Sequence, residues 1–136
     1  GIHEFNYLIY PHAGDWTEGY IYHEAAKLNS PLIICQTGPE TGGTLPLEYS
    51  FLKISNHSLI LSALKKSEYN NSVIIRVYNP SGTQIKSNLE FFKPIKQANC
   101  VNMNEEKLPG QVAIKNNSIS LTVPKKKIVT LSVIFK

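Results

Sequence analysis

The sequence is poor in arginine and in long apolar runs, and these two shortages argue against two classes of partner. Arg76 is the single arginine among the 14 basic residues. Because proteins that read nucleic acids depend on arginine for bidentate contacts to bases and phosphates, we expect no nucleic-acid partner. No apolar run approaches the roughly 18–20 residues of a membrane-spanning helix, and no basic segment followed by an apolar core marks a signal peptide. We therefore expect no membrane partner and a cytoplasmic location.

Cysteine is scarce too. Cys35 and Cys100 stand far apart in the sequence and lack the C-x-x-C spacing of a redox or metal motif. In a chain with no visible secretion signal, two such thiols are expected to be reduced rather than bridged. The net charge is +4. The basic run at residues 125–127 is interpreted as a solvated turn before a strand rather than as a phosphate site.

The length of 136 residues predicts a single domain over residues 1–136, because domains of roughly 100–150 residues are the most common. A chain of this size buries about two-thirds of its unfolded surface and needs no disulfide or metal to fold. The chain begins with Gly1 rather than methionine. We therefore expect it to be a piece of a longer protein, and the family resemblance given below implies that this piece is the C-terminal fragment.

The N-terminal stretch predicts a strand, a turn and a helix in close succession. Residues 5–10 are apolar on both faces, as in a strand that is covered on both sides, and a proline ends the strand. Asp15 and Glu18 stand at the spacing of a capping box. Apolar residues at helical spacing then predict a short helix over residues 16–28, and the Asn-Ser-Pro sequence after it ends the helix.

After the helix the apolar pattern has a period of two. Short alternating strands separated by Gly, Pro and Asn turns are typical of an antiparallel sandwich. The sequence therefore predicts an all-β fold, an antiparallel β-sandwich with one short helix near the N-terminus. The expected strands are residues 32–36, 49–55, 58–65, 72–78, 83–91, 96–103, 111–115, 119–123 and 129–135.

Tests for catalytic and metal motifs give no catalytic or metal-binding residue. The sequence at residues 23–27 approaches a zincin motif, but Lys27 stands where the second histidine ligand is required, and an ammonium group cannot bind zinc. Asp15 and Glu18 could in principle act as the acid and base of glycoside cleavage. Capping of a helical turn explains the pair more simply, and we favour that interpretation.

Two further residues are candidates for binding. Arg76 lies in the middle of an apolar strand, where an unpaired charge is costly. We expect it to form an ion pair with a nearby glutamate, and the alternative is a contact across a domain face. Trp16 lies at the edge of a turn, among several tyrosines, where an exposed ring could stack on a sugar or contact another domain. His12, Asp15, Trp16 and Arg76 are thus the candidates for carbohydrate binding or for a domain interface.

Residues 3–7 (HEFNY) and 10–16 (YPHAGDW) together resemble the motif that opens the C-terminal β-sandwich region of glycoside hydrolase family thirty-eight, the α-mannosidases. Residues 76–79 (RVYN) resemble a later element of the same region. The resemblance implies a parent enzyme that is a zinc-dependent, retaining α-mannosidase with an aspartate nucleophile. In that family the metal and the nucleophile belong to an N-terminal catalytic domain, so no catalytic or zinc residue is carried over to this sequence.

The leading hypothesis is therefore a non-catalytic C-terminal domain that packs against the catalytic domain of its parent chain. The expected partners are that catalytic domain and, through the parent, a mannose-containing glycan. No cofactor is expected in this fragment, since the resemblance places zinc in the parent catalytic domain, and the fragment alone is expected to be inactive. The alternative is a carbohydrate-binding module that uses Trp16 and nearby tyrosines. A third hypothesis is an adhesion or scaffold sandwich unrelated to sugars.

Overall fold

The computed structural model describes residues 1–39 and 41–136. These residues form two compact units, residues 1–35 and residues 36–136, which are described in turn. The interpretation of residues 1–136 as one domain stays a prediction. Among the described residues, no helix is long and apolar enough to cross a membrane.

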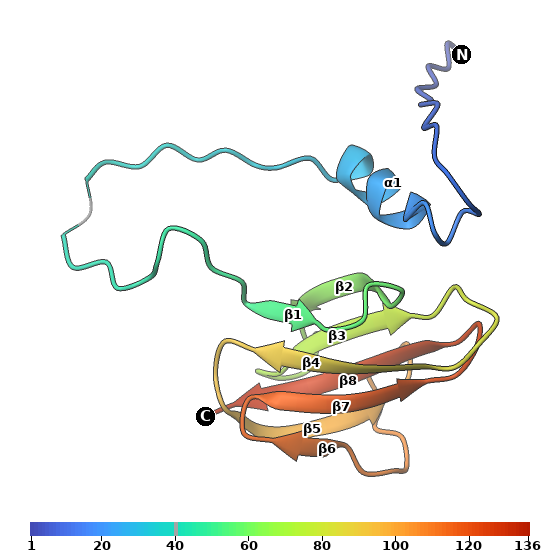
Figure 1. Ribbon diagram of the computed structural model, residues 1–136. Coiled ribbons are helices and arrows are strands. Elements are labelled where there is room, and N and C mark those ends of the chain that lie inside the picture. Colours follow the sequence, from blue (N-terminus) through green and yellow to red (C-terminus); the bar gives the residue numbers. More distant parts are fainter. Residues whose placement is uncertain (40) are drawn as a thin grey trace. The chain divides into compact units, whose positions relative to one another are not determined.

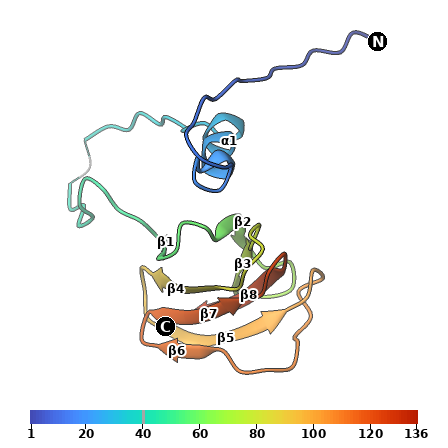
Figure 2. The same cartoon turned by 45° about the vertical axis from the view of Figure 1, so that its right-hand side comes forward.

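The second unit is a β-sandwich of two four-stranded sheets (Figures 1 and 2). Neighbouring strands in both sheets are antiparallel. The predicted all-β, antiparallel sandwich is therefore confirmed. The first sheet has the order β1 (Leu52–Ile54), β4 (Ile85–Phe91), β7 (Ser118–Val123), β6 (Ala113–Lys115), and the second has the order β2 (Ile60–Lys66), β3 (Val73–Tyr78), β8 (Ile128–Phe135), β5 (Ile95–Val101).

The core forms because apolar residues alternate along the strands. In β4 the side chains of Ile85, Leu89 and Phe91 are buried, whereas the even-numbered positions of the strand face solvent. Leu89 pairs with Ile119 of β7, so the two apolar positions lie on one face of the sheet. Each such buried side chain stabilises the fold by about 1.5–3 kcal/mol relative to its exposed state. The buried core residues are Leu59, Ile75, Val77, Ile85, Leu89, Phe91, Ile95, Ala98, Ile119, Val123, Leu131 and Val133.

A two-residue turn, residues 116 and 117, joins β6 to β7. Lys115 pairs with Ser118 across the turn, and Asn116 has a φ of 54°. Asparagine tolerates this left-handed conformation better than most residues. The turn therefore fixes the register in which Ile119 enters the core.

The first unit contains one helix, α1 (Ile21–Asn29), which follows a hydrogen-bonded turn, and extended chain before the turn and after the helix. The helix begins at Ile21 rather than at residue 16, because Tyr20 has a φ of 52° and interrupts the helical geometry. The short helix near the N-terminus is thus confirmed, with a later start.

Two of the expected strands are not formed, and this part of the prediction is wrong. Residues 5–10 and 32–36 carry no strand pairing, and their side chains are exposed. A strand exists only where a neighbouring strand takes up its backbone N–H and C=O groups, and among the described residues these segments have no such neighbour. The expected strand over residues 49–55 is shortened to β1 for the same reason.

Candidate functional site

The motif at the N-terminus folds into a compact turn, which we call the motif turn (residues 12–19). The carboxylate oxygen Oδ1 of Asp15 accepts hydrogen bonds from the backbone N–H groups of Thr17 at 2.8 Å and Glu18 at 3.0 Å. The Glu18 carboxylate accepts one from the N–H of Asp15 at 3.1 Å. These backbone hydrogen bonds lower the pKa of Asp15. The predicted capping pair is therefore confirmed, although it caps the turn that precedes α1 rather than the helix itself.

The two glycines of the motif turn are required by close contacts. Gly14 has a φ of 72°, and a Cβ there would lie 1.8 Å from Oε2 of Glu18. A Cβ on Gly19 would lie 2.6 Å from the imidazole ring of His12. The packing of the turn thus accounts for the spacing of the His, Gly, Asp, Glu and Gly residues in this stretch.

His12 and Trp16 lie on this turn with aromatic neighbours. The ring of His12 stacks on Tyr10 with centroids 6.1 Å apart. The Trp16 ring meets Tyr22 edge to face at 5.4 Å and remains 41% exposed. The turn therefore presents one large, half-exposed aromatic surface, and its use as a domain interface or a sugar platform stays a prediction.

Arg76 lies in the second unit, on β3, whereas the other three candidates belong to the first unit. Its side chain points from the face of β3 opposite to the buried Ile75 and Val77. The Nε–H group donates a hydrogen bond to the hydroxyl of Thr130 at 3.2 Å. The expected ion pair with a glutamate is not formed among the described residues, because the hydroxyl of the adjacent strand takes its place.

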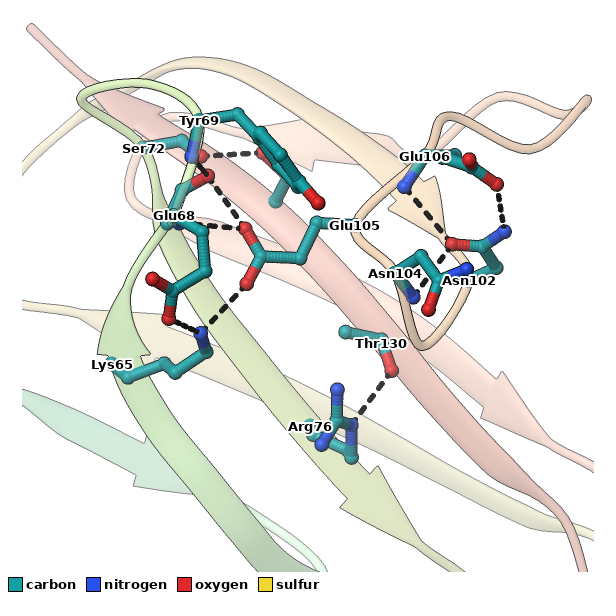
Figure 3. A network of polar contacts seen from close by, with 12 residues as sticks. Lys65, Glu68, Tyr69, Ser72, Arg76, Asn102, Asn104, Glu105, Glu106 and Thr130 are labelled. Atoms are coloured by element: carbon teal, nitrogen blue, oxygen red, sulfur yellow. Dashed lines mark hydrogen bonds and ion pairs between the residues drawn. The ribbon is translucent and has the colours of Figure 1, made fainter.

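The carboxylate of Glu105, in the loop after β5, is the centre of a polar network that reaches β2 (Figure 3). The Glu105 side chain is only 5% exposed and lies 2.8 Å from the ammonium group of Lys65. It also accepts hydrogen bonds from the Ser67 hydroxyl at 2.6 Å and from the N–H of Glu68 at 3.0 Å. These contacts, led by the hydrogen bond from Lys65, lower the pKa of Glu105 to about 2. We call these four residues the Glu105 clasp.

The loop after β5 is built to hold Glu105 in this position. Oδ1 of Asn102 accepts hydrogen bonds from the N–H groups of Asn104 and Glu106, and its amide group donates to the Glu106 carboxylate (Figure 3). Glu105 itself has a φ of 66°, a conformation that costs a non-glycine residue about 1 kcal/mol. Ile74, the cross-strand neighbour of Lys65, is fully buried although it lies on the outer face. The loop thus closes over this end of the sheet.

Asn79 is a second polar centre, placed where β3 ends. Its side chain is 1% exposed, and its amide group donates to the carbonyl oxygens of Thr83, Val123 and Pro124 at 2.7–3.1 Å. Its Oδ1 accepts hydrogen bonds from the N–H and hydroxyl groups of Ser81. One side chain therefore ties the β3–β4 turn to the end of β7, and this explains the asparagine of the RVYN element.

A series of aromatic rings in contact leads from the core to the surface, and we call it the ladder. Phe91 and Phe92 each pack on Phe135, Phe92 packs on Phe51 at 5.2 Å, and Phe51 packs on Tyr49 at 5.4 Å. A hollow of about 550 Å³ adjoins the outer end of the ladder and is lined by Pro46, Glu48, Tyr49, Ser50 and Lys53. The sequence analysis did not predict this cluster. The sequence signal for it is the pair of adjacent phenylalanines at the end of β4, because only the first of them can point into the core.

The family that the sequence resembles uses zinc, and the residues of this chain do not fit that metal. Within residues 1–39 and 41–136, no group of three histidine, cysteine, aspartate or glutamate side chains comes together as a metal site. His3, His12 and His23 therefore do not form one with the neighbouring carboxylates. No catalytic step through zinc is derived for these residues.

The geometry defines a β-sandwich domain with structural polar networks. In agreement, residues 58–131, more than half of the chain, match the family model described as "Glycosyl hydrolases family 38 C-terminal beta sandwich domain". The chain belongs to this family.

The curated relatives are much longer proteins. The chain is 27% identical over 126 residues to alpha-mannosidase 2C1 of Mus musculus. This match covers 90% of this chain and 12% of that protein. It is 24% identical over 140 residues to alpha-mannosidase 2C1 of Homo sapiens, covering 100% of this chain and 13% of that protein. Alpha-mannosidase G of Dictyostelium discoideum is 30% identical over 82 residues, which is 60% of this chain and 8% of that protein. The chain thus spans roughly an eighth or less of the length of these relatives.

Proposed function

We propose that this chain is the non-catalytic C-terminal part of a larger α-mannosidase, in which it packs against the catalytic domain and supports it. One observation carries the proposal: the chain belongs to a family of C-terminal sandwich domains, and it spans 13% or less of relatives that are named as α-mannosidases. The polar centres at Glu105 and Asn79 support it as well, because their side chains bond to neighbouring loops and strands of the sandwich. These polar side chains thus stabilise the fold of the sandwich, and the proposal gives them no catalytic role.

The proposal assigns zinc, the nucleophile and the contact with a mannose-containing glycan to the catalytic domain of the parent. The lack of a metal-ligand group among the described residues is compatible with this division. The cytoplasm is proposed as the compartment, since both Cys35 and Cys100 are free thiols.

The direct test is an assay of this chain with an aryl α-mannoside in the presence of added zinc. We expect no release of the aryl group above the buffer rate, whereas the full-length protein should hydrolyse the substrate. Measurable turnover by the 136-residue chain would refute the proposal.

The proposed interface is tested in the full-length protein by Trp16→Ala. Trp16 is half exposed on the motif turn, and loss of a large ring from a domain contact is expected to lower thermal stability or mannosidase activity. Tyr69→Ala is the matched control, because Tyr69 is a more exposed ring, at 74%, on a loop of the sandwich. An unchanged enzyme after the Trp16 substitution would count against the interface.

Carbohydrate binding is the second candidate function, favoured by the exposed face of Trp16 and its contact with Tyr22. Because Trp16 is the single tryptophan, its fluorescence reports directly on ring stacking. Titration with mannose oligomers is expected to shift the emission if the ring binds sugar. No change at millimolar oligomer rejects this candidate.

A further inference from the structure

We propose that the two extended segments of the first unit, residues 5–10 and 32–35, are strands of a sheet that belongs to the remainder of the longer polypeptide. We call them the donor segments. The inference rests on the proposed function and adds to it the surface through which the chain joins its parent. It also assigns residues 1–35 to a different folding unit from the sandwich.

The first observation is the exposure of the donor segments. The side chains of Phe5, Tyr7 and Ile9 are 82–88% exposed, and those of Leu32, Ile33 and Ile34 are 93–96% exposed. Burial of each such side chain would contribute about 1.5–3 kcal/mol. Contiguous exposed apolar surface of this kind marks a contact with another part of a protein.

The second observation is the pattern of the donor segments. In residues 5–10, apolar side chains stand at both odd and even positions, and residues 32–35 are apolar without a break. A half-buried strand alternates between apolar and polar residues, whereas a strand covered on both faces is apolar throughout. Pro11 and Pro31 stand at the ends of the segments, where proline is tolerated because a strand pairing stops there. The pattern therefore fits internal strands of a layered fold.

The third observation concerns the backbone. Among the described residues, the donor segments have no strand partner. The N–H and C=O groups of such a strand require pairing once its side chains are buried. The motif turn and α1 between the segments are ordered by their own hydrogen bonds. The first unit is thus a locally folded connection between two extended segments that have no sheet to pair with among the described residues.

The extent of the sequence matches indicates which part of the polypeptide pairs with the donor segments. The sandwich family model begins at residue 58, whereas the match to the human relative covers the whole chain, donor segments included. Residues 1–35 therefore accompany the sandwich in the human relative but lie outside the sandwich model. Because 87% or more of each relative lies beyond the matched part, that remainder supplies the sheet.

Amide hydrogen exchange tests the inference, with peptide-resolved measurements on the 136-residue chain and on the full-length polypeptide. In the 136-residue chain, the amides of the donor segments are expected to exchange near the rate of unstructured peptides at every protein concentration. In the full-length protein they are expected to exchange at least about a hundredfold more slowly, as paired strands do. Rapid exchange in both proteins would overturn the inference. Protection in the 136-residue chain would also overturn it, since the segments would then pair with the sandwich or with a second copy.

A proline variant gives a second, sharper readout. Leu8→Pro removes an N–H group in the middle of the first donor segment and should abolish its protection in the full-length protein. Thr44→Pro is the matched control, because Thr44 lies in an exposed stretch that carries no strand, and it should leave the exchange of residues 5–10 unchanged. Equal exchange in the two variants would contradict the inference.

The mannosidase assay separates this inference from the proposed function. If the full-length protein hydrolyses an aryl α-mannoside but its donor segments exchange rapidly, the strand assignment fails and the proposed function stands. If the full-length protein does not hydrolyse the substrate, the proposed function fails whatever the exchange rates are.

Discussion

The ammonium group of Lys65 on β2 lies 2.8 Å from the carboxylate of Glu105, which a separate loop carries over the sheet. The two residues are distant in sequence, and the loop residue adopts a left-handed backbone conformation to make the contact. The pair therefore fixes the loop to β2 and closes one end of the sandwich.

The Glu105 clasp is expected to make stability depend on pH in the acid range. The pKa of Glu105 is lowered from 4.5 to about 2 in the folded state. A carboxylate with a lowered folded-state pKa stabilises the fold above its unfolded pKa, and this contribution is lost as the pH falls from about 4.5 toward 2. Urea unfolding of the native chain should therefore show a falling free energy of unfolding over this range.

The matched variants for this prediction are Glu105→Gln and Glu48→Gln. The first should lower stability at pH 7 and flatten the pH dependence below pH 4.5. The second should behave as the native chain, because Glu48 is exposed and forms no ion pair among the described residues. Identical pH profiles for the Glu105 variant and the native chain would refute the role of the clasp.

Replacement of Asn79 by alanine or by aspartate should strongly destabilise the fold. Asn79→Ala removes the amide donor from three carbonyl oxygens, of which that of Thr83 keeps the Ser81 hydroxyl, and each lost partner of a buried group costs about 1–3 kcal/mol. Asn79→Asp should be at least as destabilising at pH 7, because a carboxylate would face the same oxygens. We expect both variants to lose about 3 kcal/mol or more in urea unfolding.

Asn71→Asp is the control for these variants, since Asn71 is exposed in the loop that precedes β3. It should change the free energy of unfolding by no more than about 0.5 kcal/mol. A mild effect of Asn79→Asp, comparable to that of the control, would show that the amide hydrogen bonds do not hold the turns together.

Gly14→Ala should disrupt the motif turn. The new Cβ would lie 1.8 Å from Oε2 of Glu18, and Gly14 has a φ of 72°. The Glu18 carboxylate must therefore move away, and the amide signals of Asp15 and Glu18 in an NMR spectrum should shift toward random-coil positions. Gly38→Ala is the control, because a Cβ there has no neighbour within 4 Å. Unshifted amides in the Gly14 variant would contradict the close packing of this turn.

The two cysteines should react with thiol reagents at different rates. Cys35 is exposed, whereas Cys100 packs against the core and burial raises the pKa of its thiol. Because the thiolate is the reactive form, a native-state titration at pH 8 should show one fast and one slow thiol, at least about tenfold apart. Cys35→Ser should remove the fast phase. Absence of reactive thiol before reduction would instead reveal a disulfide.

The sandwich could be predicted from the sequence because its strands bury one face each. The alternation of apolar and polar residues in β4 is a local signal, and it leads to the observed structure. The capping pair of Asp15 and Glu18 was likewise readable from spacing alone. These features depend on residues that are close together in the sequence.

The predictions that failed depend on partners elsewhere. Residues 5–10 have the composition of a strand, but strand structure requires a neighbour, and the described residues supply none. The partner of Arg76 was expected to be a glutamate and is the hydroxyl of Thr130, because antiparallel pairing of β3 with β8 sets the two residues opposite each other. Glu105 gave no sequence signal, since its role depends on a loop that folds over another strand.

The coding sequence upstream of residue 1 tests the central claim most directly. The account predicts that the same reading frame continues upstream into a catalytic domain with zinc ligands and an aspartate nucleophile. It also predicts a region of strands that can receive residues 5–10 and 32–35. An upstream sequence without such a catalytic domain would contradict the assignment of this chain as the C-terminal part of an α-mannosidase.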